Sequence, residues 1–66
     1  MMKNTRKLKK GQIRMINNGN PKEHGQLYMI IGVVNHAELK VYNLTTKLVE
    51  FWDLHEEDLH MDIVVM

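Results

Sequence analysis

The chain has 66 residues, with nine basic and eight acidic side chains, a formal net charge of +1 and no cysteine. This length allows one domain at most, and a domain of this size buries only roughly 60% of the surface that its unfolded chain exposes. Without cysteine, neither disulfides nor thiolate-bound zinc can reinforce the fold. No apolar run approaches the roughly 18 residues of a membrane span, and no secretory signal is present, so we expect a cytoplasmic protein.

The charges are separated along the chain. Seven of the nine basic residues lie in the first 22 positions, and all eight acidic residues come at Glu23 or later. The segment 1–10 carries five of the basic residues and little apolar content beyond Leu8, so burial cannot offset the entropy lost on ordering it. We therefore expect a flexible basic arm at 1–10 and a folded domain at 11–66.

The folded part is predicted to begin with a short β-branched strand at 12–16, introduced by Gly11. Residues 17–25 collect Asn, Gly and Pro, which favour turns for different reasons, and they predict a long loop. Residues 26–34 have apolar side chains at both odd and even positions, as expected for a strand that is covered on both faces or strongly bent. Gly32 inside this strand predicts a bulge or a sharp bend.

Three more strands are predicted at 38–44, 48–53 and 60–65. A tight turn at 35–37 leads into the first of them, in which apolar and polar residues alternate clearly. Between the last two strands, the segment 54–59 has a leucine at each end and an acidic stretch inside. It is long enough for one helical turn anchored by its two leucines.

Parity suggests a register for the hairpin formed by the third and fourth strands. A three-residue loop places Leu44 opposite Leu48 and Val41 opposite Phe51, so that apolar positions share a face. A two-residue loop would place Val41 against Glu50, and a slip of one residue turns side chains to the wrong face. We therefore predict the three-residue loop.

The order of these elements resembles the SH3-like small barrels. The resemblance spans roughly residues 10–65, and it implies an all-β, five-stranded antiparallel barrel with one short helical turn before the last strand. Small uncharacterised proteins of bacteriophages and prophages look similar, which implies a phage or mobile-element origin. The features that carry the resemblance are the Lys10-Gly11-Gln12-Ile13 start, Gly25, Gly32, the segment Val41-Tyr42-Asn43 to Phe51-Trp52, and Glu57-Asp58-Leu59.

Protein binding is the function that the sequence favours. In the predicted register the last hairpin presents an apolar patch rimmed by charge, and such patches mark partner sites in which Trp and Tyr act as anchors. The acidic residues that follow would steer a basic partner. The competing interpretation is that the long loop or the arm covers this apolar patch. The predicted partner-binding residues are Tyr42, Leu44, Leu48, Trp52, Glu56, Glu57 and Asp58.

Nucleic-acid binding through the arm is the alternative hypothesis. Basic side chains could contact phosphates and release counterions, although a solubilising tail explains the same composition. The predicted nucleic-acid-binding residues are Lys3, Arg6, Lys7, Lys9, Lys10 and Arg14.

Catalysis has little support in this chain. It contains neither Cys nor Ser, the commonest nucleophiles, and no Gly-rich phosphate loop. The start and the second strand are also similar to the endoribonucleases of the toxin–antitoxin barrel class, but Leu27-Tyr28 replaces the Arg-Pro dipeptide of that class. We expect a non-catalytic protein with no catalytic residues and no cofactor.

A metal site is not predicted either. His55 and His60 stand near a pattern that resembles H-E-x-x-H, but five positions separate them, which places them about 140° apart on a helix. With Asp62 they would form an adventitious cation site at most.

The apolar end of the chain suggests self-association. Residues 63–66 carry no charge after Asp62, and an unprotected terminal strand invites pairing with another sheet. A homodimer through this strand is one hypothesis. Pairing with the first strand of the same chain is the alternative, and it would leave no need for a partner.

Overall fold

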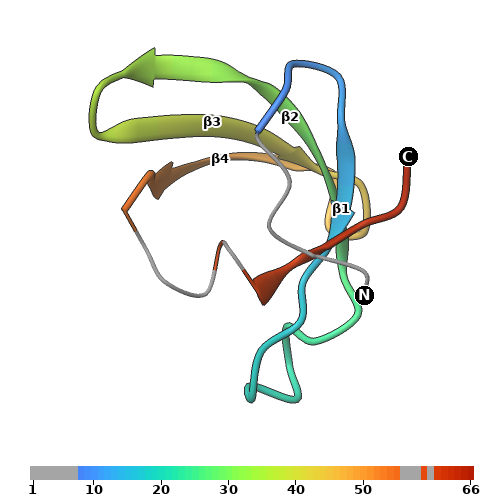
Figure 1. Ribbon diagram of the computed structural model, residues 1–66. Coiled ribbons are helices and arrows are strands. Elements are labelled where there is room, and N and C mark those ends of the chain that lie inside the picture. Colours follow the sequence, from blue (N-terminus) through green and yellow to red (C-terminus); the bar gives the residue numbers. More distant parts are fainter. Residues whose placement is uncertain (1–7, 56–58, 60) are drawn as a thin grey trace, which may run out of the picture.

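A computed structural model shows an all-β protein built on one five-stranded antiparallel sheet (Figure 1). The structure describes residues 8–55, 59 and 61–66. All five predicted strands are present, so the all-β antiparallel fold is confirmed. The strands are β1 (Ile13–Met15), β2 (Leu27–Asn35), β3 (Glu38–Asn43), β4 (Leu48–Asp53) and β5 (Ile63–Val64).

The sheet curls but is not closed by strand pairing. Its strand order is β4-β3-β2-β1-β5, so β4 and β5 form the two edges. The register of β2 against β3 shifts between Ile30 and Gly32, which confirms the irregularity predicted at Gly32. The terminal strand β5 pairs with β1, the arrangement under which its apolar sequence needs no second chain.

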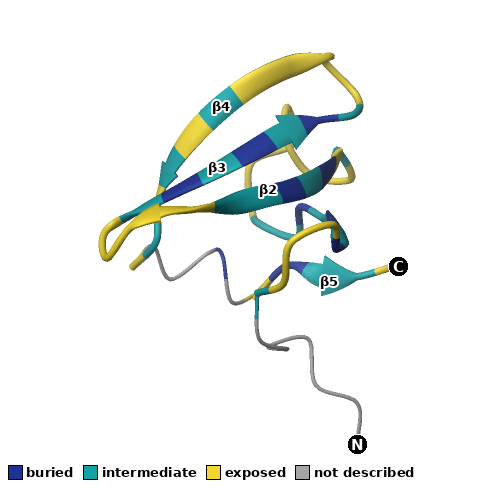
Figure 2. Ribbon diagram, turned by 90° about the horizontal axis from the view of Figure 1, so that it is seen from above, coloured by how far each residue is buried: buried dark blue, intermediate teal, exposed yellow. Residues whose placement is uncertain are grey.

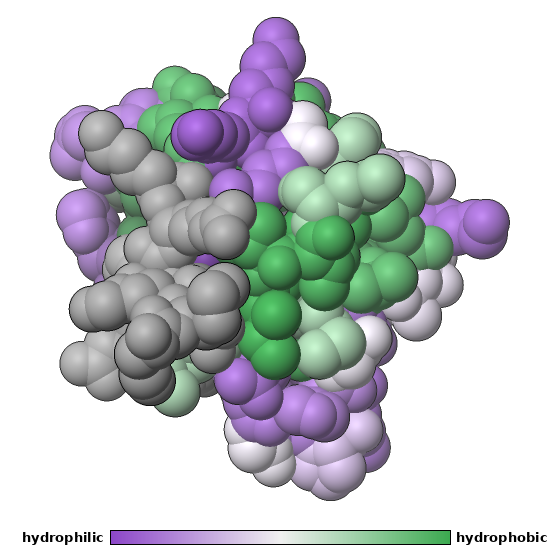
Figure 3. All heavy atoms as spheres, turned by 45° about the vertical axis from the view of Figure 1, so that its right-hand side comes forward, coloured by the Kyte–Doolittle hydropathy of each residue, from purple (hydrophilic) through white to green (hydrophobic). Residues whose placement is uncertain are grey.

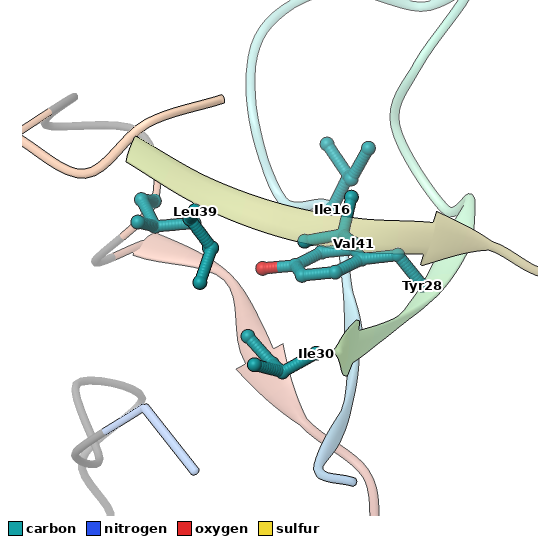
Figure 4. Packing of buried hydrophobic residues seen from close by; sticks show 6 residues of the cluster. Ile16, Tyr28, Ile30, Leu39 and Val41 are labelled. Atoms are coloured by element: carbon teal, nitrogen blue, oxygen red, sulfur yellow. The ribbon is translucent and has the colours of Figure 1, made fainter. Parts of the chain in front are cut away.

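The concave face of the sheet encloses a small hydrophobic core, shown by burial in Figure 2 and by side chains in Figure 4. Leu8, Trp52 and Leu54 pack against this core from its periphery. Leu8 belongs to the predicted arm, so the chain contacts the folded body earlier than we expected. The buried core residues are Ile16, Tyr28, Ile30, Leu39, Val41 and Leu59.

The segment between β4 and β5 is described only in part. Leu59 and Met61 are helical, and residues 56–58 and 60 lie outside the described residues. Leu59 belongs to the core and Leu54 packs against it, which confirms that the two leucines anchor this segment. No helix among the described residues has the length and apolarity needed to cross a bilayer.

The predicted register of the β3–β4 hairpin is wrong by one residue. Val41 lies opposite Glu50 and Asn43 lies opposite Leu48, whereas we expected Val41 opposite Phe51. Six consecutive pairs keep this register without a bulge, from Glu38–Asp53 to Asn43–Leu48.

The turn explains the register. The strands are joined by the segment 44–47, one residue longer than predicted, in which Lys47 has a φ of 64°. The side-chain oxygen of Asn43 accepts hydrogen bonds from the backbone N–H groups of Thr45 and Thr46, both at 2.9 Å. Asn can stabilise a turn in this way without glycine, because its side chain replaces a backbone acceptor.

The corrected register separates the two aromatic residues that we expected on one face. Trp52 lies opposite Leu39, which is a core residue, and therefore belongs to the concave face. Tyr42 lies opposite Val49 and belongs to the outer face. The predicted patch that combined Tyr42 with Trp52 does not form.

Asn43 is expected to be a stability determinant of this hairpin. It is buried, and its side-chain N–H also donates to Gln26 Oε1 at 2.9 Å. Asn43→Ala removes all three hydrogen bonds, so we expect the free energy of unfolding to fall by about 1–3 kcal/mol in urea denaturation. The control Thr46→Ala, at an exposed turn position, should change it by less than about 0.5 kcal/mol. Equal losses in the two variants would contradict the role of Asn43.

Candidate functional site

An open cleft lies between β4 and the loop that follows β1. Its volume is about 400 Å³. The strand β4 contributes Glu50, Phe51, Trp52 and Asp53, and the segment 16–26 contributes Ile16, Asn18, Glu23 and Gln26. Asn43, Leu59 and Asp62 complete the lining.

The cleft borders the edge of the sheet. Successive side chains of a strand point to opposite faces, so the four consecutive lining residues 50–53 place the strand's edge, and not one of its faces, against the cleft. The strand order ends at β4, and no described strand pairs with this edge. A second hollow of about 410 Å³ beside the β2–β3 turn shares residues 51–53 with the cleft and extends it along β4.

The loop wall of the cleft is organised by its own polar side chains. Asn18 Oδ1 accepts from the backbone N–H of Asn20 at 2.9 Å, and Asn20 Oδ1 accepts from that of Lys22 at 3.0 Å. The Asn18 amide also donates to Glu23 Oε1 at 3.1 Å. At the end of the loop, Gly25 has a φ of 94°, which glycine adopts without strain. These bonds hold Glu23 at the cleft.

Carboxylates dominate the electrostatics of the cleft. Among the described lining residues, the charged side chains are Glu23, Glu50, Asp53 and Asp62, and none is basic. Glu50 Oε1 accepts from Trp52 Nε1 at 2.9 Å, and Asp53 Oδ1 accepts from the backbone N–H of His55 at 2.9 Å. A carboxylate has about four acceptor sites, so these single bonds leave Glu23, Glu50 and Asp53 able to accept from a ligand.

Asp62 instead belongs to the floor of the cleft. It is buried, and it accepts from the hydroxyl of Tyr28 at 2.5 Å and from the backbone N–H of Asn17 at 3.1 Å. Burial first, and then this hydrogen bond and the charge of Asp62, raise the pKa of Tyr28 far above its usual 10.0, while the charge of Arg14 acts in the opposite direction. Tyr28 therefore remains a donor to Asp62 through the physiological pH range.

Trp52 forms the aromatic wall of the cleft. Its ring meets that of Tyr28 edge to face, with centroids 4.6 Å apart and an interplanar angle of 66°. Its indole N–H is oriented by Glu50, two positions earlier on the same face of β4. Trp52 is half-buried, so part of its ring remains available at the cleft.

The predicted partner-binding residues are dispersed. Trp52 lines the cleft, whereas Tyr42 lies half-buried on the outer face. Leu44 is half-buried in the β3–β4 turn, and Leu48 is exposed at the start of β4. Glu56, Glu57 and Asp58 lie outside the described residues.

The predicted nucleic-acid-binding residues differ in exposure. Arg14 is only 1% exposed, because it lies opposite Tyr28 and Val64 on the buried side of β1. Burial in this position argues against a contact between Arg14 and a phosphate at the surface. Lys9 and Lys10 are exposed, and Lys3, Arg6 and Lys7 lie outside the described residues.

The residues considered for metal binding are described only in part. Within the described part of the chain, no three His, Asp or Glu side chains are grouped so that they could hold a metal ion. Asp62 is engaged by Tyr28, His55 is exposed, and His60 lies outside the described residues.

Of the acidic residues at the cleft, Glu23 was not identified from the sequence, while Glu50 and Asp53 were expected only as charge around the predicted patch. Glu23 lies in the long loop and reaches the site only because the loop faces β4. The i, i+2 spacing of Glu50 and Trp52 does indicate one shared strand face, and this was the available signal. Asp53 is the cross-strand partner of Glu38, which depends on the corrected register.

The outer face of the sheet is a second, apolar surface. One row across it runs from Ile13 through Met29 and Tyr42 to Val49, each residue opposite the next. Phe51, 55% exposed, flanks this row beneath Lys40, whose Nζ lies 5.8 Å from the ring centroid. Figure 3, in which the side of the molecule with β1 comes forward, shows a contiguous hydrophobic area bordered by hydrophilic residues.

Comparisons of the chain with models of protein families, with curated proteins and with solved structures found no match.

Proposed function

We propose that this protein is a non-catalytic binding module that takes a basic polypeptide segment into the cleft beside β4. The observation that carries the proposal is the composition of the cleft, in which Trp52 stands with Glu23, Glu50 and Asp53 and no described lining residue is basic. A site of this composition selects cationic side chains and repels anionic ones.

Two interactions would hold a lysine or arginine in the cleft. The ammonium or guanidinium group would donate charge-assisted hydrogen bonds to the acidic side chains, and such bonds are about twice as strong as neutral ones. The exposed part of Trp52 would contact the cation or its aliphatic stem, because Trp is the best aromatic partner for a cation.

We also propose that the curled sheet is an SH3-like barrel. The meander of β1 to β4, the return of β5 to β1 and the bulge at Gly32 support it. In such a barrel the cleft would occupy the gap between the edge of β4 and the loop after β1. The proposed phage or mobile-element origin rests on the resemblance of the sequence alone.

Nucleic-acid binding remains the alternative, supported by the exposed Lys9 and Lys10. The cleft itself would repel phosphates, so this function would use the N-terminal segment and leave the cleft unused. A mobility-shift series with a short DNA duplex and a short RNA at increasing salt tests it, since phosphate contacts weaken binding steeply as salt rises.

The proposed function predicts a charge-selective ligand. We expect the hexapeptide acetyl-(Lys-Val)₃-amide to bind in isothermal titration calorimetry, and its counterpart with Glu in place of Lys to give no detectable heat of binding. Glu50→Gln should weaken the Lys peptide about three- to tenfold, equivalent to about 0.7–1.4 kcal/mol. The glutamine oxygen can still accept from Trp52, so the wall should keep its shape.

The control for Glu50→Gln is Lys47→Gln, which changes one charge at the exposed β3–β4 turn. We expect this variant to bind the Lys peptide within about twofold of the wild type, because surface charges away from the contact are screened by salt. Equal binding of the Lys and Glu peptides, or equal binding by wild type and Glu50→Gln, would refute the proposed site.

A further inference from the structure

We infer that the basic partner binds as an added β-strand, pairing its backbone with the free edge of β4. This inference rests on the proposed function and specifies how that ligand is held. It follows from the position and regularity of β4, and from the different chemistry of its two faces.

The edge of β4 is suited to strand addition. The strand has six residues and pairs with β3 in one unbroken register, so its edge is regular and long enough for a six-residue partner. At about 3.3 Å per residue, the paired length would be about 20 Å. Proteins usually protect such edges with proline, a bulge or charged side chains, and β4 has only the acidic charges of Glu50 and Asp53, which a basic strand would neutralise. By contrast, β5 at the other edge has two residues.

The charges of β4 select the kind of strand that can be added. Glu50 and Asp53 would repel a second copy of β4 or any acidic strand laid beside them, and they attract a basic one. The free edge borders the acidic cleft through residues 50–53, so backbone pairing and charge recognition occur at one place. The occupant is therefore an extended basic segment of another protein, and not a second copy of this chain.

The two faces of β4 also predict the pattern of the added strand. Glu50 and Trp52 lie on the concave face, and Val49 and Phe51 lie on the outer face, where Asp53 ends the strand. An added strand continues both faces, because directly opposed side chains share a side of the sheet. The segment should therefore alternate cationic residues, directed toward Glu50, with apolar residues beside Val49 and Phe51.

Backbone methylation of the peptide acetyl-(Lys-Val)₃-amide tests strand addition. In an added strand, alternate N–H groups point toward β4 and the others point away. One peptide carries N-methyl groups on its lysines and a matched peptide carries the same number on its valines. We expect one of the two to bind the full-length protein at least about tenfold more weakly than the parent, and the other to stay within about threefold. Similar affinities of the two methylated peptides would overturn the inference.

A second peptide tests the alternation. The block peptide acetyl-Lys₃-Val₃-amide has the same composition and charge, and we expect it to bind about tenfold more weakly than the alternating peptide. Equal affinity would overturn the predicted pattern. If the Lys peptide binds and Glu50→Gln weakens it, but methylation shows no position dependence, the proposed function stands and strand addition fails. Without any binding of the Lys peptide, the proposed function itself fails.

Occupation of the edge by a second copy would have its own signature. The apparent affinity for the alternating peptide would then fall as the protein concentration is raised, because self-association would compete with the peptide. We expect an affinity independent of protein concentration, and a fall would overturn the assignment of the edge to a separate basic partner.

Discussion

Replacing Leu39 with Ala is expected to lower the free energy of unfolding by about 2–5 kcal/mol. Leu39 is 0% exposed and belongs to the core cluster beneath the sheet. The substitution removes buried methyl groups and leaves a cavity that close-packed neighbours fill only in part. Because native domains hold only about 0.05–0.15 kcal/mol per residue, this loss would leave a 66-residue chain largely unfolded on mild heating. Urea denaturation followed by circular dichroism measures it.

The matched control is Val49→Ala on β4. Val49 is 50% exposed on the outer face, so its truncation should cost less than about 1 kcal/mol. Comparable losses in the two variants would contradict the assignment of the core to the concave face.

The free energy of unfolding is expected to fall steeply at alkaline pH because of Tyr28. Tyr28 is 0% exposed, and burial together with its bond to Asp62 raises the pKa of its hydroxyl far above 10.0. In the unfolded chain this hydroxyl ionises near pH 10, whereas the folded state keeps its proton. The stability that Tyr28 contributes is therefore complete below pH 10. Above that value the free energy of unfolding should fall by about 1.4 kcal/mol per pH unit.

Tyr28→Phe isolates this effect from the other groups that titrate in the same range. At neutral pH the variant should be about 1–3 kcal/mol less stable than the wild type, because Asp62 loses a donor. Above pH 10 the difference in stability between the two proteins should shrink. Only the wild type has the Tyr28 hydroxyl, and its ionisation in the unfolded chain favours unfolding. Urea denaturation of both proteins from pH 7 to pH 11.5 measures the difference, and a constant gap across that range would contradict the assignment.

The cleft changes the meaning of the charge separation along the chain. The sequence alone associated the basic N-terminal residues with nucleic acid and the acidic remainder with steering of a partner. In the structure, Glu23 of the loop after β1 meets Glu50 and Asp53 of β4 at the edge of that strand, beside Trp52. Acidity is therefore concentrated at a shaped site, which is why a basic polypeptide is the ligand that we propose.

Local pattern predicted the elements well. The alternation in 38–44 predicted β3, the strand predicted at 48–53 matches β4, and Gly32 marked the irregularity in β2. Leu54 and Leu59 were identified as the anchors of the segment before β5. These features depend on the preferences of single residues or on a period of two, and both can be read along the chain.

The hairpin register could not be obtained in this way. It depends on the left-handed conformation of Lys47 and on a side-chain hydrogen-bond acceptor at Asn43, and both are interactions of the folded turn. Matching apolar positions across the hairpin favoured the wrong register, with Val41 opposite Phe51, because both faces of β4 carry apolar residues. Val49 and Phe51 lie on one face and Trp52 on the other.

The sequence by itself determined which residues form strands and which side chains share a face, because a strand repeats every two residues whatever surrounds it. Only the tertiary structure decided which face turns inward. In β1 it buries Arg14 opposite Tyr28 and leaves Ile13 and Met15 on the outer face, the reverse of what hydropathy predicts. The cleft also depends on the tertiary structure, since the curl of the sheet brings the loop after β1 to the free edge of β4. No local pattern encodes that meeting, because burial and proximity depend on how the strands pair across the whole sheet.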